Sequence, residues 1–151
     1  MIKKKIMFFY VFLSVLTASV FADQGGYALD FDGIDDYVNC GSDASLEITG
    51  TAITIEAWIY PESFGGGYWD NVIVGKSDNN DEPDRGTGYY FSCGGSGQLA
   101  FVFGTGAPVP WTADLHSSNN VISTNQWQHV AATYDGSNMR LYVNGKEVSS
   151  K

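Results

Sequence analysis

Residues 51–60 (TAITIEAWIY) alternate between apolar and polar side chains, and this alternation constrains the chain to a β-sheet. Side chains at every second position of a strand point to the same face, whereas a helix repeats after about 3.6 residues. Pro61 ends the predicted strand, because proline cannot donate a ladder hydrogen bond. The two predicted faces carry Ile53, Ile55, Ala57 and Ile59 on one side, and Thr54, Glu56, Trp58 and Tyr60 on the other.

Further short strands follow the same pattern and are separated by clusters of Gly, Asn and Asp. They are predicted at residues 28–32, 72–76, 89–93, 99–103, 127–134 and 139–143. Asn144-Gly145 then predicts a two-residue hairpin turn into a last strand, because both residues tolerate positive φ. No convincing helical period accompanies these segments. Many short strands with regular turn signals indicate one all-β domain, either a sandwich or a barrel.

The first 22 residues have the organisation of an export leader. Three lysines at positions 3–5 precede an apolar run over residues 6–16. Val20-Phe21-Ala22 then places small residues at positions −3 and −1 of a signal-peptidase cleavage site. The run is shorter than the roughly 20 apolar residues that span a membrane. We therefore predict a signal peptide over residues 1–22, a secreted or cell-surface domain over residues 23–151, and no membrane insertion after cleavage.

Charge and cysteine content exclude several classes of protein. The chain has 8 basic and 17 acidic side chains, a net charge of −9, whereas nucleic-acid binding requires a basic face, so we expect no nucleic-acid partner. Two cysteines are too few for a zinc finger or a disulfide-dense scaffold. Export would permit a disulfide between Cys40 and Cys93, but we favour two small buried thiols over the bridge.

Three segments resemble successive landmarks of a known family. They read ALDFDGIDDYVNCG (28–41), ITIEAWIYP (53–61) and WQHVAATYDGSNMRLYVNGKEV (127–148). In this order they resemble the laminin G-like jelly-roll domains of the concanavalin A-like lectin/glucanase fold. The resemblance implies a jelly-roll sandwich of two antiparallel sheets, non-catalytic and often calcium-binding, with Trp127 in its core. Such domains usually continue for several more strands, so we expect the C-terminal strands of this domain to be missing.

Two acidic loops are candidate calcium sites, because carboxylates and loop carbonyls supply the roughly six to eight oxygen ligands that Ca²⁺ prefers. One covers residues 30–36 and the other covers residues 77–84 (SDNNDEPD). A likeness to the related pentraxins maps a ligand pair onto Asp78-Asn79, or a ligand onto Asp81. The alternative is a pair of solvated turns, since Asp and Asn are common turn residues. The predicted calcium ligands are Asp32, Asp35, Asp78 and Asp81.

Sugar binding requires exposed aromatic rings with a few polar groups beside them. Tyr68 and Trp69 lie in a glycine-rich loop, and Trp111 and His116 lie in the predicted loop at 105–120. These four residues are the predicted ligand-binding residues, and the predicted partner is a glycan or a glycosylated surface molecule. The alternative is that the loop aromatics pack onto the ends of the sandwich, which leaves a structural spacer or a protein-interaction domain.

A glucanase-type hydrolase is a third hypothesis. Glucanase relatives carry a Glu-x-Asp-x-x-Glu pattern on one strand face, which supplies the nucleophile and the acid. Here only Glu56 lies on that face, beside Trp58 and Tyr60, and Glu62 follows the strand-ending Pro61. We therefore predict no catalytic residues and no enzyme. The sequence favours a secreted, non-catalytic carbohydrate-binding or adhesion module that forms part of a larger exported protein.

Overall fold

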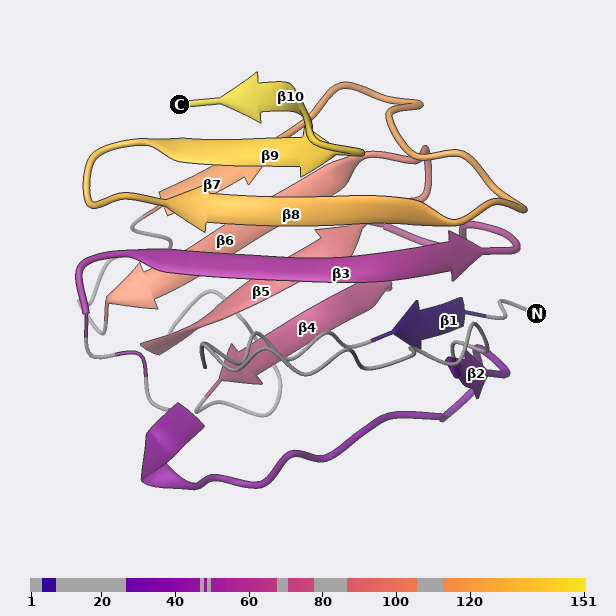
Figure 1. The fold of residues 1–151 in the computed structure, drawn as a ribbon, viewed down its shortest axis with the longest axis horizontal. Coiled ribbons are helices and arrows are strands. Elements are labelled where there is room, and N and C mark those ends of the chain that lie inside the picture. The colour runs from indigo at the N-terminus through magenta and orange to yellow at the C-terminus, as the bar shows by residue number, and fades with distance from the viewer. Residues whose placement is uncertain are drawn as a thin grey trace, which may run out of the picture.

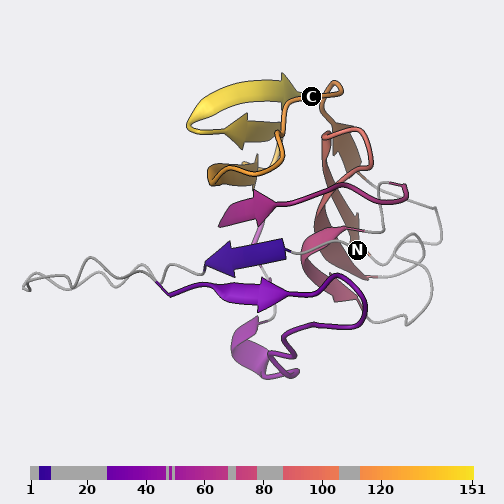
Figure 2. The same cartoon turned by 90° about the vertical axis from the view of Figure 1, so that its right-hand side faces the viewer.

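The computed structural model describes residues 4–7, 27–46, 48, 50–67, 71–77, 87–105 and 113–151. In this part of the chain, ten strands form two antiparallel sheets that lie face to face as the layers of a jelly-roll sandwich (Figures 1 and 2). A 3₁₀ helix, η1 (Ala44–Leu46), lies outside the sheets. None of the described residues belongs to a helix with the length and apolar character of a membrane span. The predicted all-β fold is confirmed.

The larger sheet has six strands in the order β10-β9-β8-β3-β1-β2. The long strand β3 pairs with β8 so that Trp58 lies opposite His129. Asn144 (φ 50°) and Gly145 (φ 75°) form the predicted hairpin turn between β9 and β10. The bounds are β1 (Lys4–Met7), β2 (Leu29–Phe31), β3 (Ile53–Pro61), β8 (Gln128–Tyr134), β9 (Met139–Val143) and β10 (Lys146–Ser150).

The smaller sheet has four strands in sequence order: β4 (Val72–Ser77), β5 (Thr87–Cys93), β6 (Leu99–Thr105) and β7 (Ala113–His116). The predicted hairpin between β5 and β6 turns at Gly97, whose φ is 67°. A Cβ at this position would lie 2.6 Å from the carbonyl oxygen of Ile122, so the turn needs glycine. The sequence placed residues 113–116 in a loop, which is wrong, because these four residues pair with β6.

The core lies between the two sheets. Ile55, Ala57 and Ile59 of β3 are buried, so the predicted inner face of this strand is confirmed. They pack with fully buried side chains of both layers, including Phe91, Phe101, Leu99, Val130 and Leu141. Each such side chain contributes roughly 1.5–3 kcal/mol when it leaves water.

The two cysteines occupy different environments, and no disulfide joins them in the structure. Cys93 is buried in the core cluster at the end of β5. Cys40 is exposed in the segment that follows β2, so the expectation of two buried thiols is wrong for Cys40. This irregular segment belongs to neither sheet, so it leaves Cys40 at the surface and not between the two layers.

Strand β1 is formed by residues of the predicted leader. Ile6 lies opposite Ile59 of β3 on one side and opposite Leu29 of β2 on the other. Both pairings are antiparallel, and β1 lies between β3 and β2 in the sheet (Figure 1). Residues 1–3 and 8–26 lie outside the described residues. The signal peptide over residues 1–22 stays a prediction.

Candidate functional site

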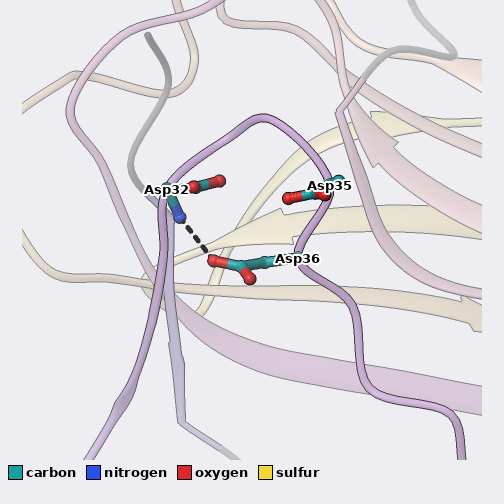
Figure 3. Close-up of side chains that lie close together, drawn as sticks. All are labelled: Asp32, Asp35 and Asp36. Carbon is teal, nitrogen blue, oxygen red and sulfur yellow. Dashed lines mark hydrogen bonds between the residues drawn. The ribbon is translucent and has the colours of Figure 1, made fainter.

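Three aspartates come together in the turn that follows β2. Gly33, with a φ of 78°, turns the chain directly after Asp32. The backbone N–H of Ile34 donates to Asp32 Oδ1 at 2.8 Å, and the N–H of Asp32 donates to Asp36 Oδ2 at 2.8 Å. As a result, one carboxylate oxygen from each of Asp32, Asp35 and Asp36 lies within 4.8 Å of the others (Figure 3). We call these three residues the acidic turn.

The acidic turn fits the requirements of a hard cation. Oxygen ligands at about 2.3–2.6 Å from Ca²⁺ are at most about 5 Å apart, which matches the observed spacing. All three aspartates are exposed, so water and loop carbonyls have access to complete the coordination. Without a cation, the three negative charges repel one another, although exposure to water weakens this repulsion. The residues present therefore suit a calcium ion.

A groove extends from the acidic turn along β4, the edge strand of the smaller sheet. It has a volume of about 800 Å³ and lies between residues 31–46 and strands β4 and β5. Lys76 connects the two walls, because its Nζ donates to the carbonyl oxygen of Leu46 at 3.2 Å. Its lining includes aliphatic side chains such as Ile34, Val38 and Val72. It also includes the polar side chains of Asp35, Asp36 and Asn39, and the phenols of Tyr37, Tyr89 and Tyr90.

The structure brings together some of the predicted site residues. Asp32 and Asp35 meet in the acidic turn, and Asp36, which the sequence prediction omitted from the ligands, completes it. The sequence signal for Asp36 was its position next to Asp35, because the turn at Gly33 brings both side chains close to Asp32. Three predicted ligand residues and two predicted calcium ligands lie outside the described residues: Tyr68, Trp69, Trp111, Asp78 and Asp81.

His116, the remaining predicted ligand residue, lies elsewhere. It ends β7 and does not line the groove. Its Nε2 is 3.8 Å from Asp114 Oδ2, and its carbonyl oxygen accepts a hydrogen bond from Ser149 Oγ at 2.9 Å. Lys151 Nζ also contacts Asp114 Oδ1, at 3.2 Å. These contacts join β7 to the C-terminal strand, and ligand binding by His116 stays a prediction.

The outer face of the larger sheet carries aromatic residues, and the sequence prediction misplaced one of them, Trp127. Trp127 was expected in the core but is 42% exposed, so that expectation is wrong. The alternation of β8 explains the difference: Gln128 and Val130 are buried, which places Trp127 and His129 on the outer face. Gln128 takes the inner position because its Oε1 accepts the N–H of Ser123 at 2.8 Å.

Comparison with known proteins agrees with this architecture. The family model Laminin_G_3, described as the concanavalin A-like lectin/glucanases superfamily, matches residues 32–151. Pappalysin-1 of the mouse, Mus musculus, is 32% identical over 131 residues; the alignment covers 82% of this chain and 8% of pappalysin-1. The chain thus corresponds to a small part of that relative. Because the family model matches most of the sequence, the chain belongs to the laminin G-like family of the concanavalin A-like lectin/glucanase superfamily.

Proposed function

We propose that this domain is a secreted or cell-surface, non-catalytic module that binds glycans through a calcium-ordered site, as part of a larger exported protein. Membership of the laminin G-like family establishes a β-sandwich binding or adhesion module. The observation that carries the finer proposal is the position of the acidic turn at the border of the tyrosine-lined groove. Export is supported by the leader-like sequence of residues 1–22.

Calcium has two roles in this proposal. Coordination by Asp32, Asp35 and Asp36 neutralises three neighbouring charges and holds the turn in one conformation. The negative charge of the whole chain, −9, raises the local concentration of cations. Hydroxyl groups of a sugar are oxygen ligands too, so a glycan lying in the groove is able to complete the coordination of the ion.

The groove offers what a saccharide needs besides the cation. Phenol rings of Tyr37, Tyr89 and Tyr90 provide apolar faces for the C–H groups of a sugar ring, and Asn39 provides an amide. Its volume of about 800 Å³ lies within the usual size range of ligand sites. The groove therefore combines apolar faces with hydrogen-bonding groups.

The face of β3 that glucanase relatives use supports a non-catalytic module. Glu56 shares that face with Thr54, Trp58 and Tyr60, so the strand supplies one carboxylate where a glycosidase needs two. Glu56 Oε2 lies 3.3 Å from His129 Nε2, so this carboxylate already has a basic partner. One carboxylate cannot act both as nucleophile and as general acid.

The test is thermal and chemical unfolding of the full chain in calcium and in excess chelator. A ligand that binds only the folded state stabilises it by about 2.7 kcal/mol at a concentration of 100 times Kd. The double variant Asp35→Asn, Asp36→Asn should lose this stabilisation. Asp30→Asn, an exposed aspartate outside the acidic turn, is the matched control and should retain it.

Glycan binding is then measured with the calcium-loaded chain on immobilised glycans. Tyr37→Ala removes an 80% exposed ring from the groove and should abolish retention. Tyr27→Ala removes a similarly exposed ring that does not line the groove and should have no effect. Stability that is indifferent to calcium, together with no retained glycan, would refute the proposal and favour the structural spacer.

A further inference from the structure

Strand β4 forms one edge of the smaller sheet, and the groove runs along this edge (Figure 1). Among the described residues, β5 is the only strand that pairs with β4. An edge strand presents a row of main-chain N–H and C=O groups that another extended chain is able to pair with. We propose that the groove is a strand-binding site, in which an extended segment of a partner protein adds to β4 as a further strand of the smaller sheet.

The lining of the groove shows that it follows the edge of β4 and not one of its faces. Residues 71–76 line the groove without interruption. A face of a strand would contribute every second residue, because successive side chains point to opposite faces. In the described part of the chain, residues 72–75 have no main-chain hydrogen-bond partner other than β5. The groups that point away from β5 therefore border the groove with the regular spacing of a strand edge.

The two walls of the groove leave room for one extended segment and exclude the edge of a second folded copy. Residues 31–46 form the wall opposite β4, and Lys76 Nζ connects the walls by donating to the carbonyl oxygen of Leu46 at 3.2 Å. The edge strand of another copy would bring its own neighbouring strand, about 4.8 Å away, into the wall formed by the arm. A segment without a sheet of its own avoids this clash.

The acidic turn lies beside the start of β4. Lys4 of β1 lies opposite Phe31 of β2 on one side and opposite Pro61 of β3 on the other. Pro61 in turn lines a small cavity together with Asn71, the residue before β4. The acidic turn follows Phe31 directly. Its negative charges therefore border the end of the groove at which β4 begins.

The side chains of the groove define the chemistry of the segment. Ile34 and Val38 of the arm and Val72 of β4 are exposed apolar side chains that line the groove, so the segment should carry apolar residues. Among the described lining residues, Lys76 is the one basic side chain, and it lies near the end of β4. The ends of the groove thus have opposite charge, and a segment with basic residues at the acidic end is complementary to it.

The direction of the segment follows from the sheets themselves. Every strand pairing in the described part of the chain is antiparallel. A segment antiparallel to β4 has its C-terminal end beside the start of β4, where the acidic turn lies. The partner that fits is therefore an extended segment of alternating apolar residues that ends in basic residues.

This inference goes beyond the function proposed above and does not rest on it. Pairing with the main chain of β4 needs no calcium, whereas the proposed glycan site is ordered by the ion. A peptide and a glycan would compete for the same groove. Binding of a peptide in chelator therefore tests the strand site alone, and a chain that fails to retain glycans leaves this result unchanged.

The experiment titrates the full chain, in chelator, with the peptide Val-Thr-Val-Thr-Val-Lys-Lys, blocked at both ends, and follows binding by calorimetry. We expect this peptide to bind, and the same peptide ending in Glu-Glu should bind about fivefold more weakly, because its charges are repelled by the acidic turn. Two further peptides carry N-methyl groups on the valines or on the threonines. One of the two should lose at least about tenfold in affinity, because its pairing edge loses the N–H donors.

Two matched variants test the position of the site. Val38 is 49% exposed and lines the groove, whereas Ile48 is 46% exposed in the same arm and does not line it. Val38→Ser should weaken binding of the lysine peptide several-fold, and Ile48→Ser should leave the affinity unchanged. In the unaltered chain, the peptide should slow amide hydrogen exchange in residues 72–77 and leave exchange in residues 146–150 of β10 unchanged.

Three results would overturn the proposal. The first is the absence of binding by the lysine peptide in chelator. The second is equal affinity of the parent peptide and both N-methylated peptides, because the groove would then bind side chains and not a strand edge. The third is slower exchange in β10 but not in β4, which would place the peptide on another edge. The N-methylated peptides are compared on the unaltered chain, so this comparison decides the question even if Val38→Ser does not fold.

Discussion

The hairpin β9–β10 and the N-terminal arm, residues 27–46 and 48, differ in how deeply they bury similar apolar side chains. Met139, Leu141 and Val143 of β9 are buried, whereas Leu29, Ile34, Tyr37, Val38 and Ile48 of the arm are exposed. Strand β9 has a neighbour on each side and faces the other sheet. Strand β2 has three residues and pairs only with β1. Alternating sequence thus yields burial only where both neighbours and an opposing layer exist.

This difference places the candidate calcium site in the less buried region. The acidic turn and one wall of the groove belong to the arm, while the sandwich supplies the other wall through β4 and β5. Regions with few buried apolar contacts open at low free-energy cost, and binding loops are commonly drawn from them. A ligand in the groove would therefore order the arm more than it orders the sandwich.

The largest effect that tests this comparison is a pair of leucine truncations. Leu141→Ala should lower the free energy of unfolding by about 2–5 kcal/mol, because Leu141 is fully buried and its loss leaves a cavity. Leu29→Ala should cost less than about 1 kcal/mol, because the side chain is 45% exposed. Urea denaturation measures both. Equal losses would mean that the arm is as well packed as the hairpin.

Two glycines with similar φ values provide the next test. Gly97→Ala should cost about 2–4 kcal/mol, because the added Cβ is strained at φ 67° and meets the Ile122 carbonyl oxygen at 2.6 Å. Gly41→Ala in the arm has a φ of 77° but no atom within 4 Å, so only the backbone strain, about 1 kcal/mol, remains. Thermal unfolding compares them. A larger loss for Gly41→Ala would contradict the structure of both turns.

Calcium should act on the arm and not on the hairpin. At ten times its Kd, calcium should slow amide hydrogen exchange in residues 32–46 about tenfold, since opening there requires release of the ion. Exchange in residues 139–150 should not change. Mass spectrometry of the exchanging chain resolves the two regions, and the Asp35→Asn, Asp36→Asn variant should remove the effect. Uniform slowing of both regions would show that calcium stabilises the whole domain.

The smallest effect concerns Asp135 in the turn between β8 and β9. A hydrogen bond from Arg140 and backbone N–H bonds from Asn138 and Ser137 hold the pKa of Asp135 well below its usual range. Its contribution to stability is therefore present above the unfolded-state pKa, about 3.9, and declines as the pH falls below it.

Asp135→Asn should thus lower the melting temperature slightly at pH 7 and by less at pH 2. Asp30→Asn makes the same change of charge in the arm, and is the control. Melting curves at the two pH values measure the difference between the variants. A deficit that grows toward acid pH would contradict this prediction, because it would require the pKa of Asp135 to be raised on folding.

Much of the fold was predictable because local patterns agreed with the final packing. The alternation of residues 51–60 predicted both β3 and its buried face, and the turn residues at 94–97, 135–138 and 144–145 predicted three hairpins. Strand β7 was missed because ADLH is short and has one buried side chain, Leu115. Pairing with β6, rather than its own sequence, makes it a strand.

The site was less predictable than the fold. Asp32 and Asp35 were selected because acidic residues cluster around a turn, and this local signal is visible in the sequence. The groove is not, because its walls come from residues 31–46 and from strands some 30 to 50 positions later. The outer position of Trp127 was visible in principle, since Val130 and Ala132 fix the inner face of β8.

Because β1 lies within the predicted leader, the order of folding and export affects what these residues can do. Residues that pair with β2 and β3 are not available as an extended, unpaired leader, which is what export machinery engages. If the chain folds before export, pairing with β2 and β3 covers the start of the leader that we propose. If the leader is cleaved before folding, the edges of β2 and β3 that pair with β1 are left without a partner strand. Non-local β-sheets fold slowly, in milliseconds to seconds. If residues 1–22 act as the leader that we propose, the rate of sheet formation decides whether they direct export or contribute a strand to the larger sheet.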